Sequence, residues 1–397
     1  MKVLSLGHIP SWAGGRQESG LANVIYQLAK HISNEPDIKM LLAATDVFEL
    51  KKQDGALIIA GWTKRVLLCY ILRHPFYCLQ SYQKLKKLKK DYPLQEPFWG
   101  LFFKRVFFKK TCQEFMPDIV HLHGPAAIWY LDIPEPSSKI AVTFHGITGT
   151  DSNLAQFEVL NKMEHDVFHS DRVSDFFFIC TQLVPLFKKA YEENHKKNTV
   201  IFNAYDSSKF FFKDGNRYVA DPQKTTLCTV ASLSDLKGQY RVLKSLSTIT
   251  NKGAFKYFCI GGDSEGLAES LSAYAVTNEI DFEYLGKKKP DQIREELYKA
   301  DYMIMPSSSE GFGLTFLEAI ACGVPVILPR NIPIAEEKDL INEKNSILLD
   351  DCSEMSITKV LSQINKYHFE PEAVANSFNN CSWSDIARQY VIAFKNL

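Results

Sequence analysis

The chain has 397 residues, of which 46% are hydrophobic and 23% charged, and its formal net charge is zero. This length predicts two or three domains with cores of ordinary size, and the balanced charge gives no global reason to expect nucleic-acid binding. Its nine cysteines are odd in number, scattered and without Cys-x-x-Cys spacing, which favours buried thiols in a reducing cytosol over a disulfide framework. We expect no signal peptide and no transmembrane helix, because the start is short and polar and no apolar run is long enough.

Short apolar runs recur along the chain between stretches of helical character. They lie at residues 3–6, 39–43, 56–60, 119–122, 140–144 and 176–179 in the first half, and at 199–202, 227–230, 257–260, 282–285, 302–305, 326–328 and 347–349 in the second. Buried runs that alternate with helices indicate a doubly wound parallel sheet, and two such series predict two Rossmann-like α/β domains. Ligands of such sheets bind beyond the carboxyl ends of the strands, so we expect the domains to face each other across a ligand-binding cleft.

A polar stretch at residues 188–197 predicts a hinge near residues 186–200. We therefore expect a first domain over 1–187, a second over 198–377, and a terminal segment over 378–397 that has apolar residues at helical spacing. An ordinary amphipathic end helix would show the same spacing.

Two glycines, Gly14 and Gly15, follow the first predicted strand, and a helical stretch is predicted to begin near Glu18. Glycines in this position can bring backbone N–H groups to a phosphate, although a Gly-Gly pair by itself is more typical of a plain turn. The Gly-x-Gly-x-x-Gly pattern is missing, so the sequence carries no dinucleotide fingerprint.

A basic and aromatic insert occupies about residues 62–110. Twelve basic residues stand against Asp91 and Glu96, for a local net charge of +10: Lys64, Arg65, Arg73, Lys84, Lys86, Lys87, Lys89, Lys90, Lys104, Arg105, Lys109 and Lys110. Because aromatic residues are interleaved with them, the pattern suits an anionic membrane surface, where each basic residue contributes about 1 kcal/mol. A solvated helix face over a normal core is the simpler alternative, and no RNA or DNA motif accompanies the charge.

Three histidines lie on or just after predicted strands. His145 follows the run at 140–144, a position that faces a ligand cleft in doubly wound folds, although a lone histidine there is more often structural. His121 and His123 alternate on one strand and so share a face. They lack a third ligand at sensible spacing, and we interpret them as structural.

The most informative segment is residues 301–328, which reads as strand, loop, helix and strand. Glu310 lies in the loop, Gly311 and Gly313 allow a close backbone approach, and Glu318 lies inside the helix. A helix N-terminus attracts a diphosphate, and carboxylates are good acceptors for the hydroxyls of a sugar or a ribose. Two solvated glutamates on a surface loop and helix are the alternative.

This segment resembles the Glu-x7-Glu signature of the retaining glycosyltransferases of family GT4, which have the GT-B fold. Residues 230–238 resemble the Gly-Arg-Leu…Lys-Gly motif of that family, with Lys237 in place but Ser232 where the family has arginine. Three further turns resemble family motifs in the right order, at residues 200–206, 260–263 and 284–286. The first half matches only at the glycine loop and around 117–146, as expected if it binds a variable acceptor. The tail at 378–397 resembles the closing, Trp-containing helix of GT-B proteins, which implies that it crosses back onto the first domain.

The resemblance implies a metal-independent hexosyltransferase-type enzyme of class EC 2.4 with a nucleotide-sugar donor, a UDP-sugar being favoured, and no other cofactor. Catalytic roles fall to His145 near the donor sugar, Glu310 on the sugar and Lys237 on the diphosphate. The remaining residues implied in donor binding are Gly14, Gly15, Ser232, Gly261, Gly311, Phe312, Gly313, Leu314, Thr315 and Glu318. No Asp-x-Asp metal motif appears. With an arginine missing at Ser232, Arg241 or Arg330 would have to replace it, or the helix start must hold more of the diphosphate charge.

The acceptor implied is a glycan or a lipid-linked molecule, in cell-surface polysaccharide or glycolipid synthesis. We expect a cytoplasmic protein with a peripheral position at the inner face of the membrane through residues 64–110, and no nucleic-acid partner. Ser232 keeps open a non-catalytic GT-B protein that binds glycan or supports a partner transferase. A nucleotide-sugar 2-epimerase of the same fold is a further alternative, although such enzymes lack the Glu-x7-Glu context.

Overall fold

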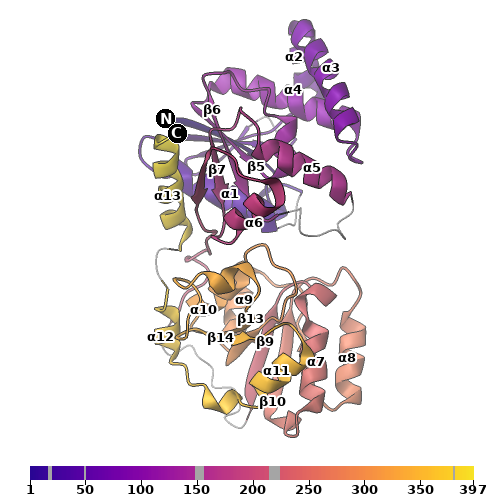
Figure 1. The fold of residues 1–397 in the computed structure, drawn as a ribbon, viewed down its shortest axis with the longest axis vertical. Coiled ribbons are helices and arrows are strands. Elements are labelled where there is room, and N and C mark those ends of the chain that lie inside the picture. Colours follow the sequence, from indigo (N-terminus) through magenta and orange to yellow (C-terminus); the bar gives the residue numbers. More distant parts are fainter. Residues whose placement is uncertain (17–19, 49–50, 148–155, 214–223, 379–380) are drawn as a thin grey trace. The chain divides into compact units, whose positions relative to one another are not determined.

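The structure is a computed structural model that describes residues 1–16, 20–48, 51–147, 156–213, 224–378 and 381–397. The chain divides into two compact units, which are described separately (Figure 1). Unit 1 comprises Met1–Asn203 and Trp383–Leu397, and unit 2 comprises Ala204–Ser382. Glu18 and residues 379–380 of the predicted terminal segment lie outside the described residues.

Unit 1 is built on an eight-stranded sheet with the order β3-β4-β2-β1-β5-β6-β7-β8. Its strands are β1 (Lys2–Gly7), β2 (Lys39–Ala44), β3 (Lys51–Asp54), β4 (Leu57–Ala60), β5 (Ile119–His123), β6 (Lys139–Phe144), β7 (Asp175–Phe178) and β8 (Lys197–Val200). All neighbours are parallel except β3 and β4. The predicted doubly wound parallel sheet is confirmed, with the addition at one edge of β3, a strand not predicted, which joins β4 through a hairpin that turns at Gly55 with φ +60°.

The predicted boundary between the domains also needs correction. β8 pairs in parallel with β7 of unit 1, so the predicted run at 199–202, which overlaps β8, belongs to the first sheet and does not open the second. The polar stretch at 188–197 is the end of a helix and a short loop, both inside unit 1. In the loop, the Lys196 ammonium donates to the carbonyls of Ser170 and Val173 at 2.8 and 2.6 Å. The units meet at Asn203 and Ala204 rather than between residues 187 and 198.

The helices of unit 1 are α1 (Gly20–Ser33), α2 (Lys64–Arg73), α3 (Pro75–Asp91), α4 (Phe98–Phe115), α5 (Phe157–Phe168), α6 (Leu183–Tyr191) and α13 (Trp383–Lys395). α13 packs along α1, and both termini lie at this side of the unit (Figure 1). The Tyr390 ring packs against the rings of His121 and Phe177, and its hydroxyl lies 3.2 Å from the Thr143 hydroxyl. The last 15 residues thus complete the core of unit 1.

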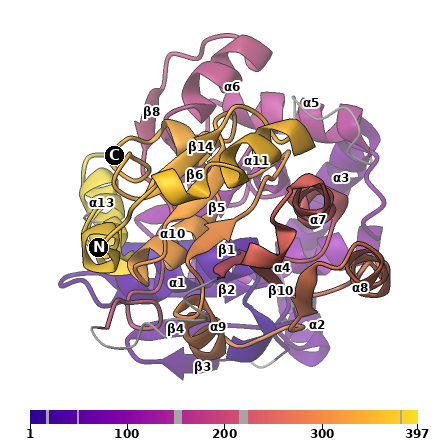
Figure 2. The ribbon, with the colours of Figure 1, turned by 90° about the horizontal axis from the view of Figure 1, so that it is seen from below.

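Unit 2 has a six-stranded parallel sheet with the order β11-β10-β9-β12-β13-β14. Its strands are β9 (Thr225–Val230), β10 (Phe255–Ile260), β11 (Asp281–Tyr284), β12 (Tyr302–Ile304), β13 (Val326–Pro329) and β14 (Ser346–Leu349). Its helices are α7 (Gln239–Thr248), α8 (Ala268–Thr277), α9 (Pro290–Leu297), α10 (Leu314–Ala321), α11 (Glu354–Leu361) and α12 (Pro371–Ala375), with α7 lying between α8 and α11 (Figure 2). The sheet and the helices α7, α8 and α11 bury one apolar core around Leu243, Tyr257 and Ile327.

The strand order of unit 2 determines where a ligand can bind. From β9 the chain proceeds to β10 and β11 on one side and then crosses to β12, β13 and β14 on the other. The connections therefore diverge between β9 and β12, and such a switch point leaves a crevice beyond the carboxyl ends of the two strands. Among the described residues of both units, no helix has the length and apolarity needed to cross a bilayer.

Candidate functional site

The loop after β12 leads directly into α10 and has the predicted strand–loop–helix–strand order. Gly313 precedes the helix with φ +92°, and a Cβ atom there would lie 2.7 Å from the Phe316 ring. At the other end Gly323, with φ +81°, follows the last turn and allows the chain to enter β13. The positive φ at each end requires glycine, so both glycines define the limits of α10.

Glu310 and Lys237 face each other across the switch point. Lys237 follows β9, Glu310 follows β12, and the Lys237 ammonium lies 2.5 Å from a Glu310 carboxylate oxygen. The Glu310 side chain is 8% exposed and that of Lys237 27%, so the pair borders solvent without being fully in it. Two residues predicted to hold different parts of a donor thus bind each other in this structure.

Backbone contacts hold the two loops that carry this pair together. The Ser308 N–H donates to the Leu236 carbonyl at 2.8 Å. Gly238 has φ +79°, and a Cβ atom there would lie 2.7 Å from the Pro306 carbonyl oxygen. Only glycine permits this approach, which brings Lys237 within reach of Glu310.

Arg241 acts as a clamp between the same loops. Its guanidinium donates to the carbonyls of Asp235 and Pro306 at 2.9 and 2.8 Å. It is therefore engaged with the backbone instead of replacing the cation missing at Ser232, while Arg330 is exposed at the end of β13. Sequence reasoning named Arg241 only as a substitute cation, because no local pattern reveals a guanidinium that binds carbonyls of two loops far apart in sequence.

Ser232 and Gly261 lie at the carboxyl ends of the neighbouring strands β9 and β10. Ser232 is exposed, and its carbonyl accepts from the Gln239 side chain at 3.1 Å. A Cβ atom on Gly261 would lie 1.9 Å from the Ala231 carbonyl oxygen, so the two strand ends can meet only at a glycine. The Tyr284 hydroxyl donates to the Gly261 carbonyl at 2.8 Å and fixes this turn.

Glu318 has a different environment from Glu310. The residue is partly exposed, but desolvation of its carboxyl raises the pKa of that group to about 7. The negative charge of Asp206 contributes to the same shift. No side chain of the described residues donates a hydrogen bond to this carboxyl, whose oxygens remain open to hydroxyl donors. Asp206 belongs to the turn at residues 200–206, which the sequence marked without indicating that it would approach Glu318.

The predicted residues of unit 1 form two separate local structures. Gly14 and Gly15 belong to a turn in which their N–H groups donate to the carbonyls of Ser11 and Pro10, each at 3.0 Å. A Cβ atom on Gly15 would lie 2.0 Å from the Ile9 carbonyl oxygen. The turn uses both N–H groups in this structure, as in the plain turn that a Gly-Gly pair typically forms, and a role of Gly14 and Gly15 in donor binding stays a prediction.

His145 is one of three packed histidines. Its Nε2 lies 3.1 Å from His123 Nδ1, and His123 Nε2 lies 3.2 Å from the Ser5 hydroxyl. The His121 ring lies 4.3 Å from the His123 ring, and its Nε2 is 2.7 Å from the Thr143 hydroxyl. Burial lowers the pKa of His145 to about 4 and that of His121 to about 3, so these imidazoles are neutral at pH 7.

The described part of the chain contains no cluster of three histidine, cysteine or carboxylate side chains arranged to hold a metal ion. Within unit 2 the structure brings together Lys237, Glu310 and the start of α10 with Gly311, Phe312, Leu314 and Thr315, and it places Ser232 and Gly261 at adjacent strand ends. Gly14, Gly15 and His145 belong to unit 1. The arrangement in unit 2 offers one cation, helix N–H groups and two carboxylates, which suits an anionic ligand that also carries hydroxyls.

The fold of the chain is shared with solved glycosyltransferase structures. The structure resembles sucrose-phosphate synthase from Thermosynechococcus elongatus with a TM-score of 0.72 at 13% identity, over 100% of this chain and 98% of that one. It resembles Anabaena Alr3699/HepE, solved in complex with UDP and glucose, with a TM-score of 0.69 at 14% identity over the whole of both chains. The chain has the GT-B fold, as predicted: two Rossmann-like α/β domains.

The family follows from the sequence of unit 2. Residues 211–368 match the family described as glycosyl transferases group 1, so unit 2 carries a domain of that family. The uncharacterized glycosyltransferase MJ1178 of Methanocaldococcus jannaschii is 34% identical over 95 residues, which are 22% of this chain and 27% of that protein. The chain thus spans about a quarter of the length of this curated relative.

Proposed function

We propose that the protein is a retaining GT4-type glycosyltransferase, which transfers a hexose from a nucleotide-sugar to a glycan or lipid-linked acceptor. The observation that carries the proposal is the Lys237–Glu310 pair at the switch point beside the start of α10. A UDP-sugar is the favoured donor, and HepE, which shares the fold, was solved with UDP and glucose.

In this proposal, different residues of unit 2 bind different parts of the donor. Glu310 would accept hydrogen bonds from the sugar hydroxyls, and Glu318 from the ribose diol. Lys237 would turn from Glu310 to the diphosphate as it binds, so that the cation and the N–H groups at the start of α10 stabilise the charge of the leaving group. Because this cation and these N–H groups would together stabilise the charge of the leaving diphosphate, the transfer would not need a metal ion.

His145 would serve the donor sugar as a neutral hydrogen-bonding group. The low pKa that burial gives its imidazole excludes a cationic role near pH 7. The contact with His123 holds the ring orientation, so His123 would position His145.

The acceptor belongs, in this proposal, to cell-surface polysaccharide or glycolipid synthesis, with the protein at the cytoplasmic face of an anionic membrane. Residues 64–110 support this placement, because they combine positive charge with exposed apolar side chains.

One observation favours a second function, a non-catalytic GT-B protein that binds glycan or supports a partner transferase. The cation missing at Ser232 is not replaced by Arg241, whose guanidinium is engaged with backbone carbonyls. Such a protein would retain a site for a nucleotide or a glycan, and this site would have a low affinity for a diphosphate.

A donor panel with detection of released nucleotide separates the two functions. We expect turnover with a UDP-sugar in the presence of EDTA, retention of the anomeric configuration in the product, and no turnover by Glu310→Gln. Glu283→Gln, an exposed carboxylate on β11, is the matched control and should keep full activity. Nucleotide binding without turnover by the wild type, with any donor and with added metal, would favour the scaffold; thermal shift detects such binding, since ligand at 100 times its Kd adds about 2.7 kcal/mol.

A further inference from the structure

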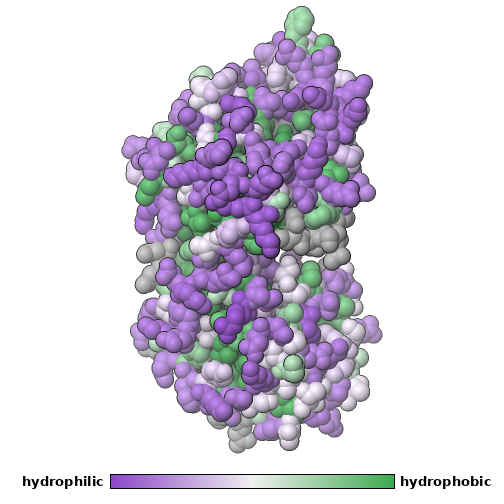
Figure 3. All heavy atoms as spheres, viewed as in Figure 1, coloured by the Kyte–Doolittle hydropathy of each residue, from purple (hydrophilic) through white to green (hydrophobic). Residues whose placement is uncertain are grey.

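The helices α2 and α3 form a hairpin whose end carries exposed apolar side chains. Leu68 and Leu72 on α2 are 53% and 81% exposed, and Phe76 and Leu79 on α3 are 83% and 55% exposed. These four residues flank the turn between the helices, which lies at the free end of the hairpin (Figure 1). Apolar surface also shows at this end among hydrophilic atoms (Figure 3). Contiguous exposed apolar residues of this kind mark an interaction surface.

The twelve basic residues of the insert fall into two groups. Five are engaged within the unit: Arg105 with Asp132, Lys104 with Glu96, Lys109 with Glu135, Lys110 with Glu114, and Lys89 with backbone carbonyls. The other seven are exposed on α2 and α3, and no described residue pairs with their side chains: Lys64, Arg65, Arg73, Lys84, Lys86, Lys87 and Lys90. These cations, of which Arg73 adjoins the apolar turn and the others lie further back along the two helices, are therefore free to meet an anionic partner, whereas the buried Arg105 is structural.

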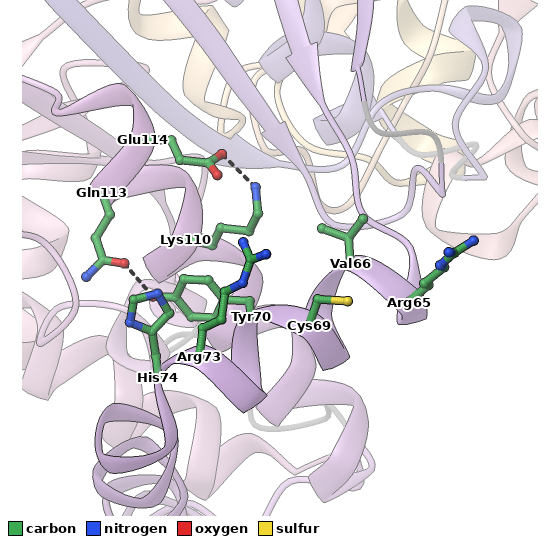
Figure 4. A pocket seen from close by; sticks show the side chains of 9 residues that line it. All are labelled: Arg65, Val66, Cys69, Tyr70, Arg73, His74, Lys110, Gln113 and Glu114. Atoms are coloured by element: carbon green, nitrogen blue, oxygen red, sulfur yellow. Dashed lines mark hydrogen bonds and ion pairs between the residues drawn. The ribbon is translucent and has the colours of Figure 1, made fainter.

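A pocket of about 500 Å³ opens between α2 and α4, beside the apolar turn (Figure 4). Arg65, Arg73 and Lys110 contribute positive charge to its wall, and Glu114, 2.6 Å from the Lys110 ammonium, is the one carboxylate. The Tyr70 hydroxyl donates to the Gln113 amide oxygen at 2.5 Å and fixes the floor of the pocket. Unpaired guanidinium groups at a pocket suit a phosphate group, to which arginine can donate two parallel hydrogen bonds.

We propose that this hairpin docks on an anionic phospholipid bilayer, with Leu72 and Phe76 inserted among the acyl chains, a lipid phosphate in the pocket beside Arg73, and Arg65 facing the headgroups. The order of side chains along α3 fits one orientation, because the apolar residues lie at the turn and Lys86, Lys87 and Lys90 follow further back, where headgroups would meet them. The inference rests on the proposed function only in that a lipid-linked acceptor gives the docking its purpose.

Vesicle flotation at low salt tests the docking, with phosphatidylcholine vesicles that contain or lack phosphatidylglycerol. We expect the wild type to float only with the anionic lipid, and the double variant Leu72→Glu/Phe76→Glu to lose about tenfold in affinity, as does Arg65→Gln/Arg73→Gln. The matched control is Val276→Glu/Met355→Glu on unit 2, where single apolar side chains are 79% and 80% exposed. This control should float like the wild type.

Three results would overturn the proposal: no flotation of the wild type at low salt, equal losses in the control variant, or binding to duplex nucleic acid in place of vesicles. Inorganic phosphate and soluble glycerol phosphate separate a free-phosphate site from a lipid site. If either compound, at constant ionic strength, displaces the protein from the vesicles, the pocket binds soluble phosphate and not a lipid headgroup. UDP binding, measured on the same variants by thermal shift, reports the site of unit 2 separately, so loss of docking and failure of the proposed transferase remain distinguishable.

Discussion

Gly313 controls the direction of the first N–H groups of α10, and its substitution gives a test of the helix start. Gly313→Val places a β-branched residue at φ +92° and a Cβ atom 2.7 Å from the Phe316 ring. We expect the first turn of α10 to shift, with strain of about 1–3 kcal/mol and a fall of at least about tenfold in UDP affinity by calorimetry. The effect should exceed that of an ordinary loop variant because Ser232 leaves the diphosphate without its second cation.

Gly266→Val is the control for this prediction. Gly266 also has a positive φ, +70°, but a Cβ atom added there would meet no other atom within 4 Å, and the residue precedes α8. The variant should lose stability through backbone strain alone and bind UDP as the wild type does. Equal losses of affinity in both variants would show that the start of α10 does not hold the diphosphate.

At the residue scale, the sequence identified the participants of the site but not their contacts. Glu310, Glu318 and Lys237 were chosen from motifs, yet the ion pair between Lys237 and Glu310 joins residues 73 positions apart. It depends on β9 lying next to β12, which no local pattern specifies. The sequence could not separate the two interpretations of Gly14 and Gly15, because a short turn and a phosphate loop share the same glycine signature.

At the scale of elements, α4 is fastened to unit 1 by a buried arginine. Arg105 is 1% exposed and donates to Asp132 at 2.7 and 3.0 Å and to the Trp129 carbonyl. Removing one partner of such a pair costs about 3–5 kcal/mol, because the other groups lose their donors. For Arg105→Met we expect the lower end of that range in urea unfolding, since Asp132 is 37% exposed and water can reach it.

Lys109→Met provides the comparison on the same helix. Lys109 pairs with Glu135 at 2.9 Å, but Glu135 is 63% exposed, and exposed pairs contribute about 1 kcal/mol or less. A loss as small for Arg105→Met as for Lys109→Met would contradict the anchoring role. The contrast also explains why the sequence predicted one cationic surface made of all the basic residues of the insert. The charge pattern does not reveal that Arg105 turns inward.

Element prediction missed β3 and assigned β8 to the wrong domain, since the apolar run at 199–202 overlaps only its last two residues. Both strands are short and polar, with the sequences Lys-Lys-Gln-Asp and Lys-Asn-Thr-Val, and both lie at the edges of the first sheet. Edge strands bury little, so their residues lack the apolar run that marks central strands. The central strands of both sheets were found because they are buried on both faces.

At the scale of the whole molecule, the two units carry titratable groups whose shifted pKa values make their stability respond to pH in opposite ways. In unit 1, burial lowers the pKa of His121 to about 3 and of His145 to about 4, and it lowers the pKa of His123 as well. The unfolded chain takes up protons near pH 6.5, before these folded imidazoles do, so acidification from pH 7 to 5 destabilises the unit. Burial raises the pKa of Asp175 to about 6, so this carboxyl stabilises the folded unit on acidification. It is a single group, and it offsets only part of the loss from the three histidines.

In unit 2 the sign is reversed at Glu318. Its carboxyl has a pKa of about 7 in the folded state, raised by burial above the ordinary glutamate value. Between about pH 4.5 and 7 the folded unit holds a proton that the unfolded chain releases. The contribution of Glu318 to the stability of the folded unit is therefore fully present below about pH 4.5 and is lost as the pH rises through 7. Unit 2 should therefore gain stability from Glu318 as unit 1 loses it from the histidines.

Hydrogen exchange by mass spectrometry on the full chain, corrected for intrinsic rates, can follow both units at once. Between about pH 7 and 5 we expect peptides from β5 and β6 to lose protection while those from β9 and β12 keep or gain it. Each buried imidazole contributes up to about 2 kcal/mol over this interval, and less where the rings face one another. His121→Gln should flatten the response of unit 1 alone, and Glu318→Gln that of unit 2 alone. Parallel losses in both units, unchanged by either variant, would show that these buried groups do not control the pH response.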